Sequence, residues 1–158
     1  MSTVLIVVII MLAAFGSVYM LKPSPRQTRL AKLRIDAIKL GLQVKLEKFK
    51  VDSKRMGVRD DIVATRYERF NPEIKSQALR WSIVRQAGWE QEGLPEGWSW
   101  HSIVKKPDLE KLNALLAKVS DDVVVFEVCD NRANLMSIEN KGSSAALINE
   151  WVAEAQAL

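Results

Sequence analysis

The sequence predicts an α+β protein: one N-terminal transmembrane helix, followed by a mostly antiparallel sheet domain with packed helices. Three observations support this class. Residues 1–21 contain no Asp, Glu, Lys, Arg or His. After residue 41 the hydrophobic pattern alternates between a two-residue and a helical period, which indicates strands mixed with helices. The links between successive predicted strands are short, and short links favour antiparallel pairing.

The transmembrane prediction rests on residues 3–21, TVLIVVIIMLAAFGSVYML, where only Thr3, Ser17 and Tyr19 are polar. A helix of this length rises ~28 Å, close to the ~30 Å hydrocarbon core of a bilayer. A cleavable signal peptide is the alternative, but it needs a basic stretch before the apolar run, and this sequence has none. We therefore expect a transmembrane helix over residues 1–21.

Basic residues follow this segment directly, and none precedes it. Positive charge near a span stays on the cytoplasmic side. The sequence thus predicts a single-pass protein of the inner (cytoplasmic) membrane, with its N-terminus outside and its C-terminal domain in the cytoplasm. The basic residues expected at the membrane surface are Lys22, Arg26, Arg29, Lys32, Arg34 and Lys39.

Residues 22–41 are predicted to be a basic linker helix. Ser24 can cap it, Pro25 suits its first position, and Gly41 can end it. This helix either lies against anionic membrane lipids or packs its leucines on the domain. Nucleic acid is not expected as a partner, because no aromatic residues interleave the basic ones.

Residues 42–158 are predicted to form one α+β domain. The nearly continuous apolar run at 122–129 is the expected centre of the sheet. Residues 87–107 are rich in glycine and proline and are expected to form turns. The expected strands are 42–51, 62–70, 78–86, 122–129 and 134–139, and the expected helices are 108–119 and 143–155.

The net charge of +4 combines two unlike parts of the chain. Residues 22–59 hold twelve basic and three acidic side chains, whereas residues 60–158 hold eleven basic and sixteen acidic ones. Such asymmetry bears on partners rather than on the fold.

Residues typical of catalysis are sparse. His101 is the sole histidine and Cys129 the sole cysteine, so neither can join a typical zinc set. Cys129 lies in an apolar run and is expected to be a buried, inert thiol. The seven glycines form no phosphate-binding loop. We expect no enzyme activity, catalytic residue, cofactor or metal, and no small-molecule substrate is evident.

Tryptophan is the least ordinary feature, since Trp81, Trp89, Trp98 and Trp100 fall within twenty residues. Aromatic side chains concentrate binding energy at protein interfaces. Trp89, Trp98 and Trp100 are therefore candidates for a partner surface. The alternative is that they cover the end of the sheet as core residues.

The first forty residues resemble the YajC-type small bacterial translocase accessory proteins. The resemblance consists of one N-terminal span, the junction Leu21-Lys22-Pro23 and the basic stretch Arg26-Gln-Thr-Arg-Leu-Ala-Lys. It implies a bacterial inner membrane and an accessory role beside a larger complex. The Gly-Asp-x-Val-x-Thr-x-Gly-Gly stretch associated with that family's soluble domain is absent, and residues 42–158 are too long for it.

These observations lead to one functional hypothesis and two alternatives. The hypothesis is a non-enzymatic, single-pass accessory or scaffold subunit that contacts membrane lipids and binds partner proteins of a larger inner-membrane complex. The first alternative is a lipid-sensing module that uses residues 22–50 at the membrane surface. The second is a membrane-tethered enzyme with an unrecognised site.

Overall fold

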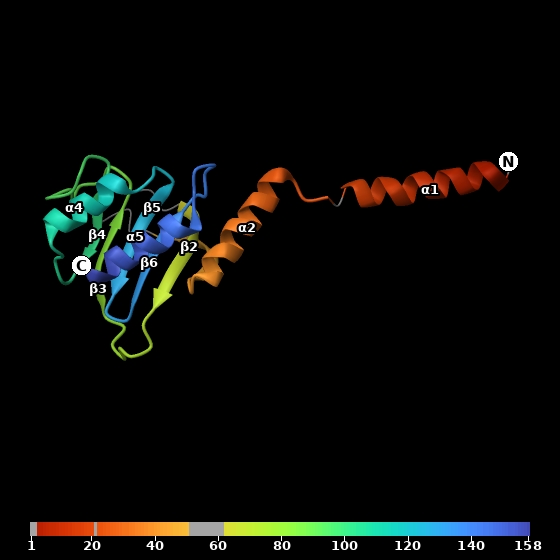
Figure 1. The fold of residues 1–158 in the computed structure, drawn as a ribbon. Helices are drawn as coiled ribbons and strands as arrows, with labels where there is room; N and C mark the ends of the chain where they lie inside the picture. The colour runs from red at the N-terminus through yellow and green to blue at the C-terminus, as the bar shows by residue number, and fades with distance from the viewer. Residues whose placement is uncertain (1–2, 21, 51–61) are drawn as a thin grey trace. The chain divides into compact units, whose positions relative to one another are not determined.

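The computed structural model describes residues 3–20, 22–50 and 62–158. The chain divides into two compact units, Met1–Lys32 and Leu33–Leu158. Figure 1 shows the elements of both units. In chain order they are α1 (Thr3–Met20), α2 (Pro25–Lys39), β1 (Gln43–Phe49), β2 (Ile62–Phe70), β3 (Leu79–Val84), β4 (Ser99–Ile103), α4 (Leu109–Lys118), β5 (Val123–Cys129), β6 (Arg132–Ser137) and α5 (Ala145–Ala157).

The first unit contains α1, and here the structure corrects a prediction. Within the part of the chain that the structure describes, no helix is long and apolar enough to cross a membrane. The prediction of a transmembrane helix over residues 1–21 is therefore wrong, and so is the single-pass membrane class built on it.

The boundaries of α2 follow from local chemistry. The Ser24 N–H donates to Gln27 Oε1 at 2.8 Å, and the Gln27 N–H donates to Ser24 Oγ at 3.2 Å, which is a capping box. At the other end Gly41 adopts φ +88°, and the Leu42 N–H donates to the Ala37 carbonyl at 3.1 Å. Glycine takes this left-handed conformation readily and ends the helix. The helix predicted between Pro25 and Leu40 is thus confirmed.

The second unit is built on one six-stranded sheet in the order β1-β2-β6-β5-β3-β4. Every neighbouring pair is antiparallel. The predicted α+β class with an antiparallel sheet is therefore correct for this unit. The apolar strand β5 and its hairpin partner β6 are the two central strands, as the apolar run at 122–129 indicated.

The main core lies between the sheet and the helices. Alternate residues of each strand point to this face, so Tyr67 on β2, Phe126 on β5 and Leu135 on β6 share it. Leu112 on α4 and Trp151 on α5 pack into the same cluster, and both are buried. Asp108 begins α4 as its N-cap, with its carboxylate accepting from two backbone N–H groups.

The second face of the sheet has its own smaller core. Phe49, Ala64, Val84, Val125 and Met136 form one buried cluster there. These five residues come from β1, β2, β3, β5 and β6, so the cluster crosses most of the sheet. The sheet is consequently buried on both faces near this cluster.

Two elements differ from the prediction. The strand β4 lies inside the stretch expected to form turns, and it pairs with β3. It was missed because glycine and proline surround its five residues. The last strand begins at Arg132 rather than near residue 134, because a tight turn at Asp130 and Asn131 joins it to β5.

Candidate functional site

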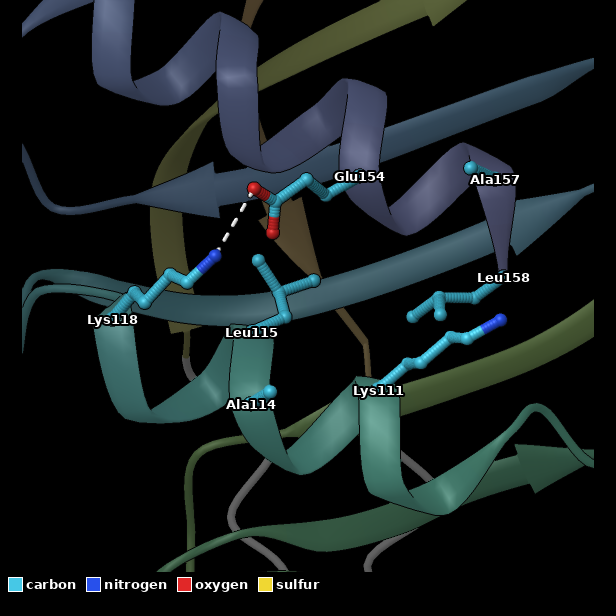
Figure 2. A pocket seen from close by; sticks show the side chains of 7 residues that line it. All are labelled: Lys111, Ala114, Leu115, Lys118, Glu154, Ala157 and Leu158. Carbon is cyan, nitrogen blue, oxygen red and sulfur yellow. Dashed lines mark hydrogen bonds and ion pairs between the residues drawn. The ribbon is translucent and has the colours of Figure 1, made fainter.

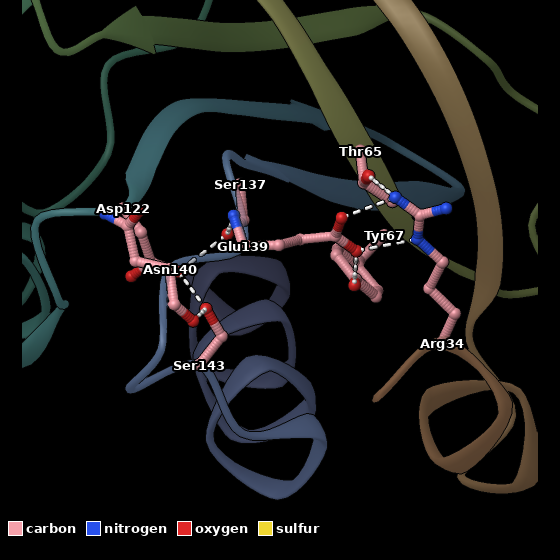
Figure 3. A network of polar contacts seen from close by, with 8 residues as sticks. All are labelled: Arg34, Thr65, Tyr67, Asp122, Ser137, Glu139, Asn140 and Ser143. Carbon is pink, nitrogen blue, oxygen red and sulfur yellow. Dashed lines mark hydrogen bonds and ion pairs between the residues drawn. The ribbon is translucent and has the colours of Figure 1, made fainter. Parts of the chain in front are cut away.

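Glu139, just after β6, is a buried carboxylate with 4% of its side chain exposed. It adopts φ +55°, which is uncommon for a residue with a side chain. Arg34 of α2 donates to it twice, from Nε at 2.9 Å and Nη2 at 2.5 Å (Figure 3). The Tyr67 hydroxyl donates to the same carboxylate at 2.6 Å, and Arg34 also donates to Thr65 Oγ1 at 3.1 Å.

The pKa values follow from these contacts. Burial raises the pKa of Glu139, but hydrogen bonds from Arg34 and Tyr67 outweigh it and hold the pKa below its ordinary value. Burial, followed by the bond to Glu139, raises the pKa of the Tyr67 hydroxyl. An ionised carboxylate saturated by donors is a poor proton acceptor. The cluster instead fastens α2 to β2 and to the end of β6.

A second buried carboxylate, Asp122, also holds neighbouring segments together through hydrogen bonds. It accepts hydrogen bonds from the hydroxyls of Ser120, Ser137 and Ser143, with Ser137 at 2.8 Å. Burial raises the pKa of Asp122, and the three serines together lower it below its ordinary value. Ser137 Oγ also accepts from the Glu139 N–H at 3.0 Å. The two clusters are thus joined, and together they fix the segment that leads into α5 (Figure 3).

A band of polar side chains crosses the second face of the sheet. Arg66 donates to Glu47 at 3.0 Å and to Glu127 at 2.8 Å, and Asn134 donates to Glu127 at 3.0 Å. Among the residues that the structure describes, the buried atoms Arg66 Nε, Ser82 Oγ and Asn134 Oδ1 have no hydrogen-bond partner. The band therefore offers donors and acceptors to a small polar molecule such as water.

A shallow pocket of about 320 Å³ lies between α4 and α5 (Figure 2). Its apolar lining comes from Leu115 and Leu158 together with two alanines. Lys118 at its rim pairs with Glu154 at 3.3 Å, and the two side chains are 58% and 36% exposed. Exposed pairs of this kind contribute little to stability.

A pocket of about 370 Å³ lies beside the loop that precedes β4. Trp89 is 73% exposed at this pocket, whereas Trp100 is 1% exposed. An exposed tryptophan is unusual, because its large apolar surface is normally removed from water. We call the lining residues the Trp89 surface: Trp89, Glu90, Gln91, Glu92, Trp100, Ile103 and Lys106.

The loop that carries Trp89 is tied to β4 by its backbone. The Gly88 N–H donates to Ser99 Oγ at 2.7 Å, and that hydroxyl donates to the Gln86 carbonyl at 2.7 Å. The Trp100 N–H donates to the Glu90 carbonyl at 2.8 Å, and the Trp100 indole donates to the Glu92 carbonyl at 2.9 Å. The hydrogen bonds on both sides of Trp89 hold this part of the loop in one conformation.

The structure separates the three tryptophans named as a candidate partner surface. Trp89 is exposed, while Trp98 and Trp100 are buried in the main core. The ring of Trp98 lies under the Arg85 guanidinium, 5.3 Å from its centroid. Trp89 is thus the member of the three that can contact a partner with most of its side chain. Sequence alone could not separate them, because the burial of each tryptophan depends on packing against residues that are distant in the sequence.

The basic residues expected at a membrane surface also separate. Arg34 turns toward Glu139, and Lys39 pairs with Asp36 at 3.4 Å. The remaining four are Lys22, Arg26, Arg29 and Lys32, which belong to the first unit. Sequence reasoning missed the role of Arg34, because its partner Glu139 is 105 residues away along the chain.

Metal-ligating side chains do not cluster in the described part of the chain, where no three of His, Cys, Asp or Glu could hold a metal ion. Cys129 is buried, and its thiol raises the pKa of Arg132 through a hydrogen bond. Comparison of the chain with protein-family models, with curated proteins and with solved structures found no match. The resemblance of the first forty residues to YajC-type proteins therefore stays a prediction.

Proposed function

We propose that this protein is a non-enzymatic accessory subunit whose α+β domain binds a partner protein through the Trp89 surface. One observation carries the proposal: an exposed tryptophan at a pocket that the buried Trp100 also lines. Tryptophan is enriched among the few residues that dominate the binding energy of protein interfaces.

The fixed loop supports this proposal. Binding is weakened when a loop must become ordered on contact with its partner. Here the carbonyls of Gln86, Glu90 and Glu92 already accept hydrogen bonds from Ser99 or Trp100. The loop is therefore already ordered before binding, and it loses little conformational entropy when a partner binds.

The polar clusters support a non-enzymatic role. General acid–base catalysis works best with a group that exchanges a proton near neutral pH. The carboxylates of Glu139 and Asp122 have lowered pKa values, and the Tyr67 hydroxyl has a raised one. All three groups are consequently held in one protonation state at neutral pH, as structural groups are.

Site-specific photocrosslinking tests the proposal. A photoreactive phenylalanine analogue replaces Trp89 in the full chain at native level, and the same analogue replaces Leu147 of α5, which is 42% exposed, as the control. We expect a discrete crosslinked protein from position 89 alone. Excess wild-type chain should compete for it at lower concentration than excess Trp89→Ala chain. Equal crosslinking at both positions, or none at position 89, would overturn the proposal.

A further inference from the structure

We propose that the Trp89 surface binds a basic segment of the partner, in which a lysine or arginine stacks on Trp89 and pairs with Glu90 or Glu92. This inference rests on the proposed function and names the chemistry of the partner. A face of an exposed indole attracts a cation, and guanidinium groups are the most frequent partners. The exposure of Trp89 leaves its indole accessible to such a group.

The charges around Trp89 have the sign that this partner requires. Glu90 and Glu92 line the pocket with one basic residue, Lys106. Lys106 lies 3.9 Å from Glu92, whose side chain is 91% exposed, so their pairing is weak and a second cation can displace it. Glu96 adds a further exposed carboxylate to the same loop. The lining therefore favours a positively charged group.

The apolar part of the lining indicates which residues the partner segment should contain beside its basic one. Ile103 is 41% exposed and lies at the same pocket as Trp89. A segment that places an apolar side chain beside its basic one can cover Ile103 while the cation occupies Trp89.

Peptide binding to the full chain tests the inference. The probe is fluorescently labelled Arg-Leu-Arg-Leu-Arg amide, measured by anisotropy, with Glu-Leu-Glu-Leu-Glu amide as the charge-reversed probe. We expect the basic probe alone to bind, and binding to weaken as salt is raised. Trp89→Ala should weaken it about five-fold and Trp89→Phe less, since phenylalanine keeps a ring face.

The carboxylates provide the matched comparison. The double variant Glu90→Gln, Glu92→Gln should lose about as much affinity as Trp89→Ala, whereas the exposed Glu150→Gln on α5 should bind as the wild type does. All variants should keep the wild-type melting temperature. Equal binding of both probes, or unchanged affinity in the double variant, would overturn the inference.

Two further outcomes separate this inference from the proposed function. A peptide with the sequence of residues 26–34 of this chain tests whether a second copy of the chain is the partner. If that peptide binds more tightly than the probe, the inference that the basic segment belongs to another protein is overturned. If the crosslink at position 89 forms but the basic probe does not bind, the inference fails and the proposed function stands. If the crosslink is also absent, both fail.

Discussion

Phe49 of β1 and His101 of β4 lie in edge-to-face contact, with 5.1 Å between ring centroids and 64° between ring planes. Their strands are the two opposite edges of the six-stranded sheet. Neighbouring strands are ~4.8 Å apart, so the edges of a flat sheet would be ~24 Å apart. The sheet therefore curls until its edges approach each other, and the small core of the second face fills the curve.

This closure predicts a role for Phe49 in stability. Phe49 is 9% exposed, and its replacement by alanine should lower the free energy of unfolding by about 3 kcal/mol, because the ring leaves a cavity and the edge contact is lost. Urea denaturation measures this change. Phe70→Ala on β2 is the control, since Phe70 is 46% exposed and should lose less than about 1 kcal/mol. Equal losses of unfolding free energy in the two variants would contradict a role for Phe49 in holding the two sheet edges together.

The two tryptophans at one pocket should behave in opposite ways. Trp100→Ala should lower the free energy of unfolding by about 3–5 kcal/mol, because Trp100 is buried and its indole donates to the Glu92 carbonyl. Trp89→Ala should change it by less than about 0.5 kcal/mol, because its side chain is exposed. Thermal and urea unfolding of both variants check this. A destabilised Trp89→Ala variant would show that the Trp89 ring contributes to the stability of the fold.

The Glu139 cluster predicts how stability depends on pH. The pKa of Glu139 is lowered in the folded chain, so protonation favours unfolding. Its contribution is fully present above the unfolded-chain pKa of about 4.3 and is lost as the pH falls through the lower folded value. Glu139→Gln should cost about 2 kcal/mol at pH 7, since Arg34 loses its charged partner.

Urea denaturation between pH 7 and pH 3 measures this dependence. The wild type should lose stability more steeply below about pH 4.3 than Glu139→Gln does. Asp122 has a lowered pKa as well, so the Glu139 variant keeps part of the acid sensitivity. Parallel curves for wild type and variant would contradict the assignment of a lowered pKa to Glu139.

Gly93 is predicted to hold the loop of the Trp89 surface in place. It adopts φ +77°, and a Cβ there would lie 2.8 Å from Leu109 Cδ1. Gly93→Ala should therefore lower the free energy of unfolding by about 1–2 kcal/mol. Gly142→Ala is the matched control, because a Cβ at that position meets nothing within 4 Å. Thermal unfolding of the two variants should differ accordingly, and equal melting temperatures would contradict the strain at Gly93.

Local features of the fold could be predicted well. The helix that starts at Pro25 was recognised from Ser24, Pro25 and Gly41, because capping and helix termination involve neighbouring residues. The helix predicted over residues 108–119 and the apolar strand β5 were recognised from local pattern in the same way. The transmembrane prediction was wrong, and there the apolar run alone was not sufficient evidence.

The candidate site could be predicted only in part. The sequence indicated tryptophan as the residue type of a partner surface. Tryptophan also occurs in cores, however, so the residue type alone does not show which tryptophans are exposed. The loop that exposes Trp89 lies against β4 through hydrogen bonds donated by Ser99 and Trp100. Because β4 itself was not predicted, that placement could not be predicted either.

The sequence by itself determined the α+β class, most element boundaries and the acidic character of the region after residue 60, since these depend on local periodicity and charge. The tertiary structure decided the strand order, the contact of Phe49 with His101 and the pairing of Arg34 with Glu139. The two side-chain contacts each join residues that are more than fifty positions apart. Their pairing follows from the packing of the whole unit, which no local pattern encodes.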